Sequence, residues 1–221
     1  MNFLDYTPAL IVAIPLFGAF LTPIISKINE KIRNIFVIII LIITAGLVFL
    51  LTQDVFTNGP RAYIFGNANV TIPVVRILFE VDGISMFMAI ISITLALLGV
   101  IYSWSFMKEN DGLDKYYTLV LLLVTSMLGM ELTGDMFNFF VFLEISCISS
   151  CALIAFYINK GEALEAAFKY IVISAIGALF VLFAVGLFYA QYNALNMAQW
   201  CSRRGGPTTI HASINRACAR K

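Results

Sequence analysis

"GDMFNFFVFLEISCISS", Gly134 to Ser150, places one carboxylate, Glu144, among phenylalanines, isoleucines and small polar residues. Continued to Tyr157, this apolar stretch is long enough to cross a hydrocarbon core of about 30 Å as a helix. It lacks the alternation of a β-barrel strand, and a helix satisfies its own backbone hydrogen bonds in lipid. The stretch therefore predicts a transmembrane helix with an acidic residue near its centre.

The rest of the chain has the same apolar character. Hydrophobic residues make up 61% and charged residues 12% of the sequence, whereas about a quarter of a soluble domain is charged. The pattern predicts an all-α, polytopic transmembrane bundle with a long external loop at 53–82, where the residues around GNAN (66–69) favour a short β-hairpin. The expected spans are about 8–25, 35–52, 83–107, 116–132, 134–157 and 163–190.

The loop charges predict the orientation of these spans. Most basic residues before the tail fall in the first, third and fifth loops, and the second loop carries Arg61 and Arg76. The positive-inside bias then puts the N-terminus outside a cytoplasmic membrane. No Lys or Arg precedes the first span, so we expect it to remain as an anchor rather than to be cleaved as a signal peptide. The net charge of +1 and the scattered charges indicate no nucleic-acid partner.

The last segment, residues 191–221, differs from the rest of the chain. It loses the apolar periodicity and gains basic residues on the side where six spans would leave it outside, against the positive-inside bias. This change favours a frameshifted or otherwise non-native tail, and a native disordered basic tail is the alternative.

Glu144 requires a physical explanation, because an acidic residue at the centre of a span costs a few kcal/mol. Cys147 and Cys151 follow it on the same helical face, with serines beside them, so this face should point into a bundle. Burial favours the neutral carboxyl and a nearby cation favours the carboxylate, and a balance of the two suits a proton carrier. The alternative is a protonated Glu144 that makes a structural hydrogen bond between helices.

Lys169 is the only basic residue within the predicted spans. The fifth and sixth spans are antiparallel, and a rise of 1.5 Å per residue leaves an axial offset of about 10 Å between Glu144 and Lys169. We therefore expect no direct salt bridge between them. Either water connects the two side chains, or the cation closest to Glu144 lies elsewhere. The alternative for Lys169 is snorkelling to the membrane interface.

The remaining acids and the cysteines suggest simpler roles. Asp82 and Asp135 precede apolar runs and are expected to be helix N-caps. Glu131, in the connection between the fourth and fifth spans, is expected to be interfacial, with an ion entrance as the alternative. The cysteines show no CxxC spacing and the one histidine, His211, lies in the tail, so we expect no metal, haem or other cofactor.

Three segments carry a family resemblance: FEVDGISMFMAII (79–91), LTGDMFNFFVFLEISCISSCALIAFY (132–157) and EALEAAFKYIVISAIGALFVLFAVGLFYA (162–190). They resemble the antiporter-like membrane subunits shared by respiratory complex I, Mrp-type cation/proton antiporters and energy-converting hydrogenases. The resemblance implies that Glu144 couples to a lysine on a broken seventh helix and that Lys169 belongs to the same intramembrane charge line.

The resemblance also implies a larger assembly. Family members have about fourteen helices in two inverted repeats, and six are expected in this sequence. We therefore expect the N-terminal part of an H⁺- or Na⁺-translocating subunit without a redox centre. Its expected partners are other membrane subunits and a peripheral redox arm that carries the electrons. A structural membrane scaffold and a small oligomeric secondary transporter are the alternatives.

Overall fold

The computed structural model describes residues 6–64, 78–107, 112–192 and 195–197. Each of six helices within these ranges is long and apolar enough to cross a membrane. The expected all-α bundle of about six spans is confirmed, and the chain is a multi-pass membrane protein. The helices are α1 (Thr7–Ser26), α2 (Glu30–Asn58), α3 (Gly83–Phe106), α4 (Leu113–Leu132), α5 (Met136–Ile154) and α6 (Gly161–Tyr192).

Helix α2 is longer at both ends than the apolar pattern predicts. It begins where the Asn29 side chain accepts a hydrogen bond from the Lys31 N–H at 2.9 Å. It continues to Asn58 and ends at Gly59, whose φ of 84° suits a residue without a side chain. Residues 53–58, expected in the external loop, are therefore helical, and α2 includes Arg33, which the apolar pattern assigns to the first loop.

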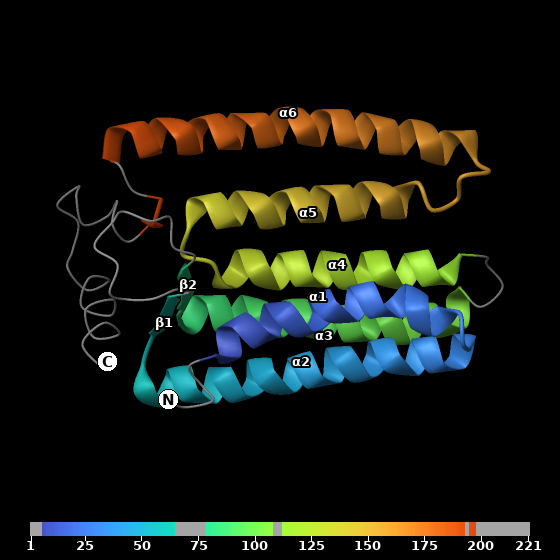
Figure 1. The fold of residues 1–221 in the computed structure, drawn as a ribbon, viewed down its shortest axis with the longest axis horizontal. Coiled ribbons are helices and arrows are strands. Elements are labelled where there is room, and N and C mark those ends of the chain that lie inside the picture. The colour runs from blue at the N-terminus through green and yellow to red at the C-terminus, as the bar shows by residue number, and fades with distance from the viewer. Residues whose placement is uncertain (1–5, 65–77, 108–111, 193–194, 198–221) are drawn as a thin grey trace.

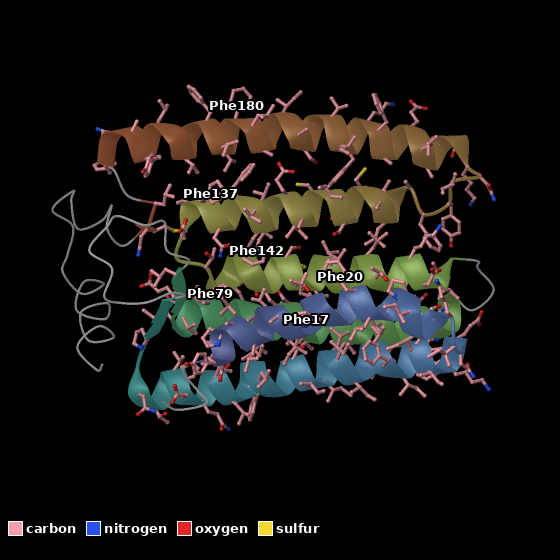
Figure 2. The ribbon with its side chains drawn as sticks, in the orientation of Figure 1. Phe17, Phe20, Phe79, Phe137, Phe142 and Phe180 are labelled. Atoms are coloured by element: carbon pink, nitrogen blue, oxygen red, sulfur yellow. The ribbon has the colours of Figure 1, made fainter. Side chains whose placement is uncertain are left out.

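Four of the helices form a compact group, and the other two lie in sequence along one side of it. Helices α1 to α4 pack on one another, α5 packs against α4, and α6 packs mainly against α5 (Figure 1). Buried aliphatic side chains such as Ile11, Leu41 and Leu121 fill the space between the first four helices. Phe142 of α5 is buried on the side that faces α4, whereas Phe180 of α6 is 70% exposed (Figure 2). The outer face of α6 is thus almost uncovered by the described residues.

Two short antiparallel strands, β1 (Arg61–Ile64) and β2 (Leu78–Val81), pair at one end of the bundle, which we call the hairpin end (Figure 1). Antiparallel strands on the two sides of GNAN (66–69) agree with the expected hairpin, and the turn expected at GNAN lies outside the described residues. The Gly134 N–H donates to the Leu78 carbonyl at 2.8 Å, so β2 holds the connection between α4 and α5.

The opposite edge of the α4–α5 connection pairs with the segment that follows α6. The Met136 N–H donates to the Leu195 carbonyl, and the Met197 N–H donates to the Gly134 carbonyl, both at 3.1 Å. The start of α5 is therefore fixed from two sides by backbone hydrogen bonds. Residues 191–192 and 195–197 are the part of the 191–221 tail that the structure describes, and the nature of this tail stays a prediction.

Candidate functional site

Glu144 lies in the middle of α5, and its side chain is half-buried. Asp135 starts this helix by accepting hydrogen bonds from the N–H groups of Phe137 (2.8 Å) and Asn138 (3.4 Å). The cap fixes the first turn of α5, and the regular helix then sets the direction of Glu144.

Neighbouring contacts identify the side of α5 that carries Glu144. Phe142 packs against α4, and a residue two positions later lies about 200° around the helix. Cys147, one turn from Glu144 and close enough to interact with it, contacts Ser174 of α6. Cys151 donates to the Ala167 carbonyl of α6 at 3.5 Å. Glu144 therefore lies on the side of α5 that faces α6, with the two thiols as packing groups along the same interface.

Lys169 has a local partner. Its Nζ lies 2.5 Å from Glu165 Oε1, one helical turn earlier on α6, and the two side chains are 69% and 66% exposed. Among the described residues, Glu165 and not Glu144 forms the ion pair with this lysine. The sequence contained the signal for this pair, since Glu followed four residues later by Lys is a favoured spacing on a helix.

Glu131 lies in the last turn of α4 rather than in the connection that follows it. Its side chain turns toward α3, where the buried Ser92 hydroxyl donates a hydrogen bond to Glu131 Oε1. The second oxygen, Oε2, is buried and has no hydrogen-bond partner among the described residues. The structure does not bring Glu131 together with Glu144, because the two carboxyl groups lie on different helix interfaces.

Two acids at the hairpin end, Asp82 and Asp135, cap helices, and burial raises the pKa of Asp135 and of Glu80. Asp82 accepts a hydrogen bond from the Ser85 N–H at 2.8 Å and caps α3. Burial raises the pKa of Asp135 above its usual range, and the N–H groups of Phe137 and Asn138 oppose that shift. Burial also raises the pKa of Glu80 on β2, with a further contribution from the charge of Asp82.

The apolar pattern gave no signal for two buried charged residues on α2. Arg33, 3% exposed, donates to Ser26 of α1 at 3.1 Å and lies 5.4 Å from the ring centre of Tyr117 on α4. Asp54, 8% exposed, accepts a hydrogen bond from Asn58 at 2.8 Å. Both residues fall where α2 continues past the apolar run, so hydropathy alone assigns them to loops.

Two family models match the chain. The model described as "NADH:quinone oxidoreductase/Mrp antiporter, TM" covers residues 133–216, which include Glu144 and Lys169. The model described as "NADH-Ubiquinone oxidoreductase (complex I), chain 5 N-terminus" covers residues 71–117. This chain belongs to the complex I/Mrp antiporter-like family.

Relatives within the complex I/Mrp antiporter-like family are considerably longer than this chain. The NADH-quinone oxidoreductase subunit N of Desulforudis audaxviator is 31% identical over 87% of this chain and 38% of its own length. A Na(+)/H(+) antiporter subunit of Bacillus subtilis is 30% identical over 85% of this chain and 37% of its own length. The chain thus spans a little over a third of these relatives.

A solved structure in the same family shares the fold. A chain of the membrane-bound sulfane sulfur reductase, an archaeal respiratory membrane complex, matches with a TM-score of 0.77 and 34% sequence identity. The match covers 86% of this chain and 38% of that one. These relatives are subunits of multisubunit membrane complexes.

Proposed function

We propose that this chain forms part of an ion-translocating, antiporter-like subunit of a membrane complex that pumps H⁺ or Na⁺, with Glu144 as its proton-binding switch. The observation that carries the proposal is the half-buried Glu144 in the middle of α5, on the side that faces α6. An ionisable group at membrane depth costs free energy and is retained where it serves transport. Electron transfer then belongs to partner subunits in a peripheral redox arm, and it alters the affinity of Glu144 for a proton through charge or shape changes.

Lys169 and Glu131 have secondary roles in this proposal. Lys169 is held by Glu165 on α6 and acts as a further member of the intramembrane charge line. Glu131, near the hairpin end of α4, acts as the entrance for the ion. The N-terminus and the hairpin end lie outside a cytoplasmic membrane, because most loop cations lie at the opposite end.

The test is Glu144→Gln in the complete complex, because Gln keeps the shape and hydrogen bonding of Glu but cannot titrate. We expect the proton gradient formed by membrane vesicles to be strongly reduced, while the amount of assembled complex on native gels is unchanged. Glu162→Gln, at an exposed position in the first turn of α6, is the matched control and should pump normally. Normal pumping by Glu144→Gln would reject the proton-switch role and favour a structural hydrogen bond.

A further inference from the structure

The contact between Ser92 of α3 and Glu131 of α4 lies on a different helix interface from Glu144. Ser92 is buried and donates to Oε1 of Glu131. Oε2 of the same carboxyl is buried and without a hydrogen-bond partner in the described part of the chain. A carboxylate with one oxygen buried and unsatisfied costs far more free energy than a neutral carboxyl in the same place.

The described helices that pack against α4 place no cation near Glu131. Helix α4 packs against α1, α3 and α5, with smaller contacts to α2 and β2, and α1 carries no charged residue. The cations of α2 and α4 lie at the ends of those helices remote from the hairpin end. The charged groups on or next to α2, α3, α5 and β2 at the hairpin end are the acids Asp54, Glu80, Asp82 and Asp135. The cation of β1 is Arg61, which pairs with Val81 on β2. Like charges disfavour ionisation of the carboxyl.

Glu131 and Glu144 lie at similar depths on different flanks. Gly129 of α4 and Phe142 of α5 are in direct contact and mark a common depth on these antiparallel helices. Glu131 is two residues from Gly129 toward the hairpin end, and Glu144 is two residues from Phe142 in the opposite direction, about 3 Å in each case. Side chains tilt toward the N-terminus of their own helix, so both carboxyl groups return toward the common depth.

We propose that Glu131 and Ser92 form a second proton-binding site, in which Oε2 of Glu131 carries the proton and Oε1 accepts the hydrogen bond of Ser92. The step is the addition of one proton to a carboxylate, and its reverse. This site is the entrance that the proposed function assigns to Glu131, and it binds its proton at a different group from the Glu144 switch. Its part in translocation rests on the proposed function, whereas its occupation by a proton rests on the Ser92–Glu131 contact and the surrounding charges.

Infrared difference spectroscopy of the full chain in phospholipid membranes at pH 7 tests the proposal. We expect Glu131→Gln to remove a protonated-carboxyl C=O band that shifts in D₂O. Ser92→Ala should keep this band but move it to higher frequency, because the carbonyl oxygen loses its hydrogen bond, and Ser92→Thr should restore the original frequency. A Glu131→Gln spectrum that loses only carboxylate bands would overturn the proposal. If Glu131→Gln does not fold, an unchanged C=O spectrum in Ser92→Ala overturns it instead.

Two further measurements distinguish a proton at Glu131 from a bound cation and from an exposed carboxylate. Glu162→Gln, at an exposed position on α6, should lose carboxylate bands only. Added NaCl at constant pH should leave the Glu131 band in place, and its disappearance would assign the site to a cation and overturn the proton assignment. The infrared result does not depend on transport, so normal pumping by Glu144→Gln would reject the proposed function without affecting the Glu131 band.

Discussion

The ring of Phe142 on α5 occupies the space beside Gly129 on α4 that a side chain would need. A Cβ atom built on Gly129 would lie 2.5 Å from two carbons of this ring. The two helices can approach closely here only because position 129 has no side chain. This contact also fixes the rotation of α5, which places Glu144 on the side that faces α6.

Gly129→Ala should therefore lower the free energy of unfolding by roughly 1–3 kcal/mol, the usual cost of overpacking. Gly99→Ala on α3 is the matched control, because nothing lies within 4 Å of its added Cβ. The control should gain up to about 1 kcal/mol from better helix propensity. Unfolding titrations in mixed micelles measure both values, and equal stability of the two variants would contradict the close contact.

Lys169→Ala should lower ion pumping by less than Glu144→Gln does, because Glu165 holds this lysine on an exposed face of α6. Glu165→Gln should change stability by about 0.5 kcal/mol or less, as is usual for exposed i,i+4 pairs. Gradient formation in vesicles compares Lys169→Ala with Glu144→Gln, and thermal melting in detergent measures the stability of Glu165→Gln. A greater loss in Lys169→Ala than in Glu144→Gln would reverse the proposed ranking of the two charges.

Arg33→Ala should destabilise the bundle by roughly 2–4 kcal/mol, since it removes the hydrogen bond that the buried Arg33 donates to Ser26 and the packing of a cation on Tyr117. Lys31→Ala, two residues earlier and exposed, is the control and should stay within about 0.5 kcal/mol of the wild type. Thermal melting in detergent compares them. Equal melting temperatures for the two variants would show that the contacts of Arg33 with α1 and α4 do not stabilise the bundle.

Glu80→Gln should stabilise the hairpin end at neutral pH. The pKa of Glu80 is raised above its ordinary value of 4.5, so the folded state holds this proton more strongly than the unfolded chain does. The stability of the wild type should then fall as the pH rises from 4.5 through the raised pKa, and stay lower above it.

Hydrogen exchange of the Gly134 amide, which donates to Leu78 beside Glu80, measures this dependence. After correction for the intrinsic rate, protection should decrease with pH in the wild type and remain level in Glu80→Gln. Glu162→Gln supplies the control, and parallel pH curves for the wild type and Glu80→Gln would refute the prediction.

Much of the fold could be predicted because its cause is local. A run of apolar residues such as Gly83 to Phe106 must form a helix in lipid, where the backbone has no water to bind. The same local chemistry predicted Asp82 and Asp135 as caps and the strands around residues 61–81. It also singled out Glu144, because an acidic residue near the centre of an apolar run is recognised from the sequence alone.

The sequence alone determined the helices, the two caps and the isolated carboxylate, since each follows from neighbours within a few turns. The tertiary structure decided which groups meet. Arg33 lies on Tyr117, Ser92 binds Glu131, and Phe142 packs on Gly129, each across a pair of helices. Hydropathy defines how far a helix continues through the membrane but carries no signal for its rotation. That rotation is set by close packing between helices, where a missing side chain such as that of Gly129 determines which face of the neighbour fits.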